Sequence, residues 1–302
     1  MSAITVPAPA KINLFLAVTG RRADGFHELV SVVAPLAWGD EIEIRGQRTG
    51  DGATELTVAG GGDEVPRDNN NLVLKAAREF RAATGWSAAA TFGLKKRVPV
   101  GAGLGGGSSD AAAALRGLNA IAGRPLGPEA LVAVAARVGS DCASLLHDGP
   151  VVMRGRGERI EVLPASAAAR LSGRRVLVFK PAFGIATAWA YGRLARMHAA
   201  DAAGGYAEAA AAEAKLAAWS AGTAPAEDLL FNSLERPAFE KFPALPLLLE
   251  RLRREFGVAA GMSGSGSACF VLLSPDAPVA DMTAVIREAW GNTSFSVETA
   301  LA

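Results

Sequence analysis

Cysteine is scarce in this chain, since only Cys142 and Cys269 occur among 302 residues and they lie far apart. No C-x-x-C pair exists, which excludes the common spacings of zinc sites and of dithiol redox centres. We therefore expect both thiols to be reduced and structural, as in a cytosolic protein.

An excess of either charge is also missing, because 31 Lys and Arg residues face 30 Asp and Glu residues. A balanced chain carries no electrostatic footprint for nucleic acid or for an anionic membrane, so we expect neither as a partner. Gly, Pro or charge interrupts every apolar run before the roughly 20 residues of a membrane span. The first residues lack the basic region and apolar run of a signal peptide. These absences predict a cytoplasmic protein. Any anion that it binds would be held by a few backbone and side-chain groups.

Strand and helix patterns follow one another without strict alternation, which predicts α+β architecture in both halves. Strand patterns cover 11–18, 28–36, 41–45, 55–58, 88–98, 151–162, 175–179 and 268–273. Helix patterns cover 71–84, 108–122, 128–138, 247–255 and 279–290, and an Ala-rich stretch at 198–222 predicts a surface helical pair. The length favours two domains, which we place at 1–165 and 166–302.

The most informative segment is Gly101–Gly107, which has five glycines in seven residues and runs into a predicted helix. Glycines let backbone N–H groups converge where a Cβ would clash. The helix start adds unpaired N–H groups and the positive end of a dipole, which together favour an anion. We expect Ser108 or Ser109 to cap this helix and Asp110 to complement its dipole. The segment therefore predicts a phosphate-binding loop rather than a flexible linker.

Other phosphate loops fit the segment less well. Gly101, Gly103 and Gly106 match the dinucleotide fingerprint G-x-G-x-x-G, but the preceding residues 94–100 are charged and contain Pro99. No Gly-Lys pair exists for a Walker loop, and the protein-kinase signatures H-R-D and D-F-G are absent. A nicotinamide-dependent oxidoreductase is therefore the weakest of the alternatives that we keep.

The loop resembles that of the GHMP small-molecule kinases, a family that includes galactokinase, homoserine kinase and mevalonate kinase. The family pattern is P-x-G-x-G-L-G-x-x-S-S. This chain reads Pro99, Val100, Gly101, Ala102, Gly103, Leu104, Gly105, Gly106, Gly107, Ser108 and Ser109. Two further segments match: P-A-K-I-N-L-F-L at 9–16 followed by G-R-R-A-D-G-F-H at 20–27, and G-M-S-G-S-G-S at 261–267. The first of them closely resembles one member, which phosphorylates a small alcohol linked to cytidine diphosphate.

The resemblance implies an ATP- and Mg²⁺-dependent kinase. Lys11 matches the catalytic lysine of the family, and Asp141 matches its catalytic aspartate. The segment Pro99–Ser109 matches the ATP loop, in which the Ser108 hydroxyl would lie near Mg²⁺. With these roles, Asp141 would accept the proton of the acceptor hydroxyl and Lys11 would offset charge on the phosphoryl group.

The resemblance also implies a substrate pocket. Phe26 and Tyr191 would stack on the cytosine, and His27 would read its polar edge. Asn13 and Thr187 lie at positions that would touch the substrate. Phe26 stands where many members have Tyr, so the stacking face is kept and a hydroxyl is lost.

The fold implied is that of the GHMP kinases, with an N-terminal domain like domain 2 of ribosomal protein S5 and a C-terminal ferredoxin-like domain. The active site would lie in the cleft between them, and the protein would be a monomer or a homodimer. Two alternatives stay open besides the oxidoreductase. One is a related kinase with another alcohol acceptor, such as homoserine, and the other is a nucleotide-binding sensor without chemistry.

Overall fold

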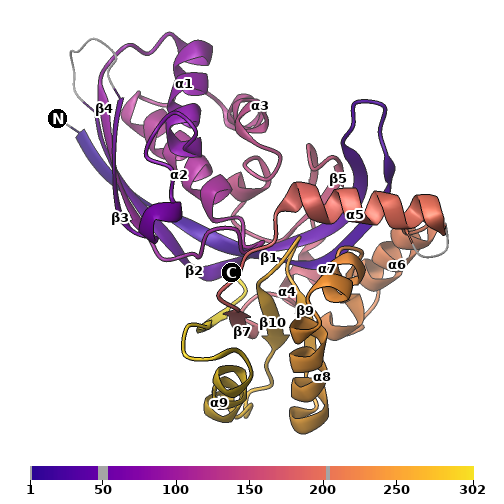
Figure 1. The fold of residues 1–302 in the computed structure, drawn as a ribbon. Coiled ribbons are helices and arrows are strands. Elements are labelled where there is room, and N and C mark those ends of the chain that lie inside the picture. Colours follow the sequence, from indigo (N-terminus) through magenta and orange to yellow (C-terminus); the bar gives the residue numbers. More distant parts are fainter. Residues whose placement is uncertain (1, 47–53, 202–204) are drawn as a thin grey trace. The chain divides into compact units, whose positions relative to one another are not determined.

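The computed structural model describes residues 2–46, 54–201 and 205–302, in which helices and strands are interleaved along the chain (Figure 1). The chain forms two compact units. Unit 1 comprises residues 1–10, 38–100 and 105–148, and unit 2 comprises residues 11–37, 101–104 and 149–302. These units interleave in the sequence because the two longest strands and the glycine loop pass from one unit into the other. The contiguous division at residue 165 stays a prediction.

Unit 1 mixes strands with three longer helices that pack on one another (Figure 1). Its strands hydrogen-bond in the order β3 (Thr54–Gly60), β4 (Ala90–Lys96) and β2 (His27–Gly46), of which residues 38–46 belong to this unit. The unit also contains residues 2–10 of β1 (Ser2–Arg21). Its helices are η1 (Gly62–Glu64), α1 (Leu72–Thr84), α2 (Gly106–Ile121), α3 (Pro128–Val138) and η2 (Ser144–Leu146).

The core of unit 1 follows from strand alternation. In β2, Ile42 and Ile44 are fully buried while the glutamates beside them are partly exposed, so one face of the strand meets the helices. Phe92 and Leu94 repeat the pattern on β4, opposite Ile44 and Ile42 in the antiparallel register. Gly117 of α2 admits this packing, because a Cβ there would lie 2.1 Å from the Ile44 side chain.

Unit 2 contains strands from two sheets. In the first sheet, residues 11–21 of β1 and 27–37 of β2 lie in the strand order β8-β1-β2-β5-β6. The second sheet has the strand order β11-β7-β10-β9. The strands not yet bounded are β5 (Val151–Gly155), β6 (Arg159–Val162), β7 (Arg175–Lys180), β8 (Phe231–Asn232), β9 (Ala259–Met262), β10 (Cys269–Leu272) and β11 (Phe295–Ala300). Its helices are α4 (Ala165–Ala169), α5 (Thr187–Ala200), α6 (Ala209–Ala221), η4 (Ala226–Leu229), α7 (Glu235–Lys241), α8 (Ala244–Phe256) and α9 (Val279–Trp290).

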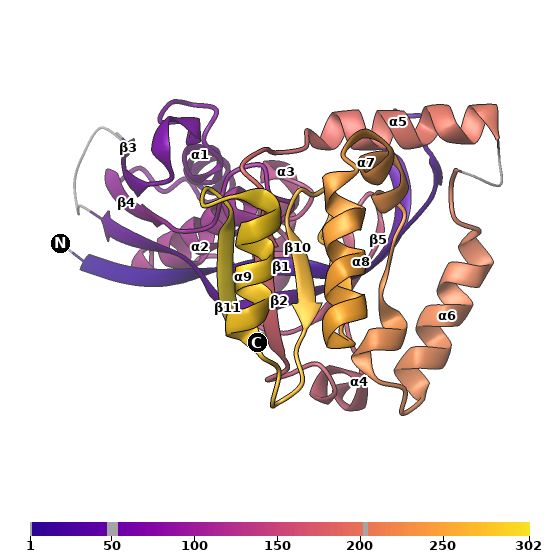
Figure 2. The ribbon, with the colours of Figure 1, turned by 60° about the horizontal axis from the view of Figure 1, so that its bottom comes forward.

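The four-stranded sheet of unit 2 is covered on one face by α8 and α9, which lie side by side (Figure 2). Leu177 and Phe179 of β7 alternate toward these helices and join their buried leucines and Ile286 in one apolar cluster. Gly257 ends α8 in the left-handed conformation at φ 64°, and the chain turns back directly into β9. The glycine motif at 261–267 therefore starts on a well-packed strand.

Several elements differ from the sequence expectations. The two strands expected at 28–36 and 41–45 form one strand, β2, because Trp38 and Gly39 continue in extended conformation. The helical pair expected at 198–222 is α5 and α6, but α5 begins earlier, at Thr187, and residues 202–204 lie outside the described residues. Helices α4 and α7 and strand β11 had no counterpart in the prediction. Within the described ranges, every helix is too short or too polar to cross a bilayer.

Candidate active site

Lys11 is a buried lysine of unit 2, with 4 % of its surface exposed on β1. Its Nζ donates to Asn13 Oδ1 at 2.6 Å and to the Gly103 carbonyl at 3.0 Å, and its backbone N–H donates to the Leu104 carbonyl at 2.9 Å. Burying an ammonium is costly unless it is hydrogen-bonded, so these oxygens both lower that cost and fix its direction. Unit 2 thus brings together the predicted residues Lys11 and Asn13 and the first half of the glycine loop.

The C-terminal glycine motif packs against the same place. Gly103 has φ 76°, and a Cβ there would lie 2.2 Å from the Ser263 carbonyl oxygen. Gly264 has φ 57°, and a Cβ there would lie 3.4 Å from Lys11 Nζ. Only glycine combines a left-handed conformation with so close an approach. The Ser263 hydroxyl donates to the Gly103 carbonyl at 3.0 Å and accepts from the Asn13 N–H at 3.2 Å, which joins the three motifs.

Thr187 also contacts the C-terminal glycine motif. It is the first residue of α5 and is exposed, and its hydroxyl lies 3.0 Å from that of Ser265. The Ser267 hydroxyl donates to the Phe183 carbonyl just before α5. The segment that precedes α5 is therefore fixed to the glycine motif, and the predicted substrate residue Thr187 is fixed with it.

His27 lies in a small aromatic cluster of unit 2. Its ring centroid is 5.0 Å from that of Tyr191 and 5.8 Å from that of Tyr206. Burial, with a smaller contribution from Arg21, lowers the pKa of His27 below its usual 6.5, so the imidazole is neutral at neutral pH. Its Nε2 is buried and has no hydrogen-bond partner among the residues that the structure describes. A neutral imidazole with an unsatisfied nitrogen can recognise a donor or an acceptor on a ligand.

Phe26 differs from an ordinary core aromatic residue, because 48 % of its surface is exposed. The guanidinium carbon of Arg156, on the turn between β5 and β6, lies 5.0 Å from the ring centroid. A cation above an aromatic face stabilises the ring position by about 0.5–1 kcal/mol at exposed sites. The stacking of Phe26 and Tyr191 on a cytosine stays a prediction.

The second half of the glycine loop belongs to unit 1 and starts α2. Gly105, at φ 69°, precedes the first helical residue, Gly106, so the prediction that Ser108 or Ser109 caps the helix was wrong. Both serines lie inside the first turn, and the Ser109 N–H donates to the Gly105 carbonyl at 2.9 Å. The N–H groups before it have no partner within the helix, which is the arrangement that favours an anion.

Asp110 is buried and lies beyond the first turn of α2, so the expectation that it complements the dipole at the helix start was wrong. Its carboxylate lies 2.8 Å from Lys96 Nζ, and Lys96 also pairs with Asp40. Burial raises the pKa of Asp110 to about 7, against the opposing effect of Lys96. A Cβ on Gly106 would lie 2.8 Å from Lys96 Nζ, so this buried ion pair directly supports the start of α2.

Asp141 lies in unit 1, in the turn between α3 and η2, and is partly exposed. The Ser144 hydroxyl donates to its backbone carbonyl at 2.8 Å. Burial raises the pKa of the neighbouring Cys142 thiol to about 12, while a hydrogen bond with Ser108 lowers it. Unit 1 therefore brings Ser108 close to the turn that carries Asp141. Lys11 belongs to unit 2, and its pairing with Asp141 stays a prediction.

Sequence reasoning missed residues that surround the glycine motif. Asn232 and Glu235 hydrogen-bond to its backbone, and Tyr206 completes the contacts of His27. The stretch N-S-L-E at 232–235 was a visible signal for the first two residues, because it resembles an N-D-L-E stretch of the family. Tyr206 lies within the Ala-rich stretch at 198–222, which offers no motif that could have marked it.

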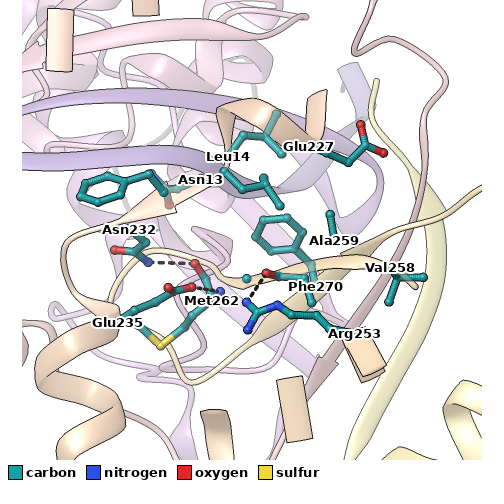
Figure 3. A pocket seen from close by; sticks show the side chains of 14 residues that line it. Asn13, Leu14, Glu227, Asn232, Glu235, Arg253, Val258, Ala259, Met262 and Phe270 are labelled. Atoms are coloured by element: carbon teal, nitrogen blue, oxygen red, sulfur yellow. Dashed lines mark hydrogen bonds between the residues drawn. The ribbon is translucent and has the colours of Figure 1, made fainter. Parts of the chain in front are cut away.

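A pocket of about 260 Å³ lies in unit 2 behind the glycine motif (Figure 3). Leu14 and Phe270 supply apolar walls, and Asn232, Glu235 and Arg253 supply polar groups. Figure 3 shows these polar side chains directed at the backbone of β9, to which they hydrogen-bond. These three side chains are thus engaged in hydrogen bonds that hold β9.

Two family models match the chain. GHMP kinases N terminal domain matches residues 71–154, and GHMP kinases C terminal matches residues 210–292. The first range contains the second half of the glycine loop, α2 and Asp141. The matches and the mixed architecture of the structure confirm the α+β fold class and the two-domain kinase fold that the resemblance implied.

Curated relatives match nearly the whole chain. A protein of Gloeobacter violaceus is 34 % identical over 99 % of this chain and 95 % of its own length, and is named 4-diphosphocytidyl-2-C-methyl-D-erythritol kinase. A protein of Granulibacter bethesdensis with the same name is 39 % identical over 89 % of this chain and 85 % of its own length.

Solved structures extend the comparison. A crystal structure of 4-(cytidine 5'-diphospho)-2C-methyl-D-erythritol kinase covers 99 % of this chain and 100 % of its own, with TM-score 0.75 and 32 % identity. Homoserine kinase from Cytophaga hutchinsonii has TM-score 0.64 and 16 % identity, and covers 96 % of this chain and 95 % of its own. The second similarity shows the fold alone.

Proposed function

Because this chain belongs to the GHMP kinase family, we propose that it transfers the terminal phosphate of ATP to the 2-hydroxyl of 4-diphosphocytidyl-2-C-methyl-D-erythritol (CDP-methylerythritol). This is a phosphotransferase reaction of the non-mevalonate route to isoprenoid precursors. The observation that carries the proposal is the match to kinases of that name at 32–39 % identity over most of both chains. The segment R-R-A-D-G-F-H at 21–27 supports this acceptor over homoserine, the runner-up.

Asp141 is our candidate for the general base. An alcohol is a poor nucleophile until its proton is removed, and a carboxylate in hydrogen-bond reach can accept that proton. The acceptor oxygen then forms a bond to the γ-phosphorus as the bond from that phosphorus to the β,γ-bridging oxygen breaks, which leaves ADP. No covalent enzyme intermediate is required, so positioning and electrostatics must supply the catalysis.

Lys11 is our candidate for the cation of the site. Its ammonium donates to Asn13 Oδ1 and to the Gly103 carbonyl, and these two hydrogen bonds fix its direction. A fixed cation stabilises the charge that develops on the moving phosphoryl group and favours the ionised form of a nearby carboxylate such as Asp141.

The backbone N–H groups between Gly101 and Ser109 are assigned to the phosphates of ATP. Mg²⁺ would neutralise charge on the β- and γ-phosphates. Among the described residues, no group of three or more His, Cys, Asp or Glu side chains could hold a metal ion. This fits Mg²⁺, which commonly binds through few protein ligands together with substrate phosphates. The Ser108 hydroxyl, at the start of α2, is our candidate protein ligand.

The base pocket is assigned to Phe26, His27 and Tyr191. The unsatisfied, buried Nε2 of His27 supports this role, because a cytosine edge would supply the missing partner. Asn13 and Thr187 are assigned to the acceptor. Tyr206, which lies 5.8 Å from His27 between ring centroids, would support the imidazole from a second side.

The test is an assay of ADP release with purified protein, ATP, Mg²⁺ and CDP-methylerythritol. Parallel reactions contain homoserine, mevalonate or no acceptor. We expect ADP release to depend on CDP-methylerythritol, with a 2-phosphate product visible by ³¹P NMR. Release that depends on homoserine instead would favour the runner-up, and nucleotide binding without any release would favour a sensor.

Location and assembly belong to the proposal as well. We place the enzyme in the cytoplasm, where its nucleotide substrates are, and expect a monomer or a homodimer without nucleic-acid or membrane partners. Light scattering coupled to size-exclusion chromatography measures the assembly directly.

A further inference from the structure

The segment at 232–235 contacts the backbone of the C-terminal glycine motif through two side chains. Asn232 is 7 % exposed, and its Nδ2 donates to two carbonyls, those of Met262 and Gly264, at 2.8 Å each. Its Oδ1 accepts from the Leu234 N–H at 2.8 Å. One amide group thus ties together two carbonyls on either side of Ser263, and it is itself fixed by its own backbone.

Glu235 binds the second backbone polar group of Met262. Its Oε1 accepts from the Met262 N–H at 2.8 Å, so both backbone polar groups of Met262 are bonded to this segment. Figure 3 shows the two side chains converging on Met262 at the end of β9. Because the carboxyl is largely desolvated, its pKa is raised, and its bond to Met262 opposes that shift.

The turn that is held in this way touches the candidate catalytic lysine. Gly264 approaches Lys11 so closely that a Cβ would lie 3.4 Å from Nζ and 3.2 Å from Asn13 Oδ1. Ser263, between the two bonded carbonyls, contacts Gly103 and Asn13, and both of these accept from Lys11 Nζ through their oxygens. Asn232 is therefore linked to the ammonium of Lys11 through the Gly264 backbone and through the contacts of Ser263.

We propose that Asn232 and Glu235 are positioning residues for phosphoryl transfer, which hold the Met262–Gly264 turn so that Lys11 and Asn13 keep their working geometry. The proposal rests on the proposed function, since it assigns Lys11 to the chemistry. Neither residue is assigned a contact with a substrate. A misplacement of about 1 Å can cost about 100-fold in rate, so a clamp at this distance can affect turnover strongly.

The two residues need different chemistry, which makes the proposal testable. Asn232 supplies two N–H donors, and aspartate in its place would direct a carboxylate at two carbonyl oxygens. Glu235 supplies only an acceptor, and glutamine keeps an oxygen there without charge. We therefore expect Asn232→Asp to be damaging, Glu235→Ala to be damaging, and Glu235→Gln to be tolerated.

The experiment measures kcat, KM and Tm for these variants, with the acceptor that supports ADP release by the wild type in the panel above. Asn119→Asp is the matched control. Asn119 is 9 % exposed in unit 1 and bonds the N–H and the carbonyl of Leu126, so its loss is purely structural. We expect kcat to fall at least tenfold for Asn232→Asp and Glu235→Ala, with KM for ATP within about threefold. Glu235→Gln and Asn119→Asp should keep kcat within about threefold.

A wild-type kcat in Asn232→Asp together with a lowered Tm would overturn the proposal, because the residue would then be structural only. Equal values of kcat in Glu235→Ala and Glu235→Gln would overturn it as well, and this pair decides the matter if Asn232→Asp does not fold. If the wild type uses an acceptor other than CDP-methylerythritol, the proposed substrate fails while the clamp is still tested with the acceptor that works.

Discussion

Lys96 in unit 1 and Lys11 in unit 2 are buried lysines that illustrate two uses of the same side chain. Lys96 in unit 1 is 8 % exposed and pairs with the carboxylates of Asp40 and Asp110. Lys11 in unit 2 is 4 % exposed and donates to a side-chain amide oxygen and a backbone carbonyl. Two carboxylates pair with the first ammonium, and two hydrogen bonds to neutral oxygens fix the direction of the second.

The difference indicates where each charge acts. A buried ion pair contributes little net stability, but the removal of one partner leaves an uncompensated charge and costs about 3–5 kcal/mol. An ammonium whose direction is fixed by hydrogen bonds can stabilise charge that develops on a substrate. Lys96 therefore supports the loop helix, and Lys11 is suited to chemistry. Variants of the two lysines, and of the carboxylates Asp141 and Asp110, test this distinction.

The largest effect is expected for the carboxylates. Asp141→Asn removes the candidate base and should lower kcat by about 10²–10⁴-fold, while ATP binding stays within a few-fold. Asp110→Asn removes a carboxylate that is engaged with Lys96, and should change kcat by less than about threefold. Steady-state kinetics and nucleotide titration of both variants measure the contrast. Similar losses of kcat would show that the two carboxylates do not have separate roles.

The next effect concerns turnover in the lysine variants. Lys11→Met keeps the length and loses the charge, and should lower kcat by about 10²–10³-fold, as for the loss of one donor to a transition state. Asn13 Oδ1 and the Gly103 carbonyl each lose one donor, so we expect the free energy of unfolding to fall by less than it does for Lys96→Met. A kcat near that of the wild type would remove Lys11 from the mechanism.

The third effect is on stability. Lys96→Met leaves Asp40 and Asp110 buried without their shared cation, and the free energy of unfolding should fall by about 3–5 kcal/mol. Urea unfolding of Lys96→Met and Lys11→Met under the same conditions measures the difference. If Lys11→Met were the less stable variant, the assignment of the two lysines would be reversed.

The smallest effect is a pH dependence. Burial raises the pKa of Asp110 from 3.8 to about 7, so the folded state binds this proton more tightly than the unfolded state does. The stability that this group contributes is complete below about pH 4 and is lost as the pH rises to about 7. The free energy of unfolding of the wild type, relative to that of Asp110→Asn, should therefore decrease between pH 4 and 7. A constant difference would mean that Asp110 has the same pKa in the folded and in the unfolded protein.

Local patterns sufficed for much of the fold. Strand alternation predicted a half-buried strand at 41–45, which lies in β2 with Ile42 and Ile44 buried, and the helix pattern at 128–138 matches α3. The glycine motifs and Lys11 could be recognised because each lies in a contiguous segment that resembles a family motif. The helix cap was misjudged because Gly105 adopts the left-handed conformation, which starts α2 before the serines.

Contacts between distant segments could not be predicted in the same way. Lys96 lies in the charged run K-K-R-V-P-V, although it follows Phe92 and Leu94 on the buried face of β4. Its burial depends on Asp40, 56 residues earlier, and on Asp110, 14 residues later. Asn232 likewise gains its role from Met262, 30 residues later. Neither spacing has a signature in a single sequence, because tertiary structure sets both.

The missing side chain of Gly103 has a practical consequence for inhibition. A Cβ at this position would collide with the Ser263 carbonyl oxygen at 2.2 Å, and the conformation at φ 76° disfavours every other residue. A compound that packs against the backbone here would engage a position at which any larger side chain is sterically disfavoured. Target-site resistance to such a compound would have to arise at another position in the protein.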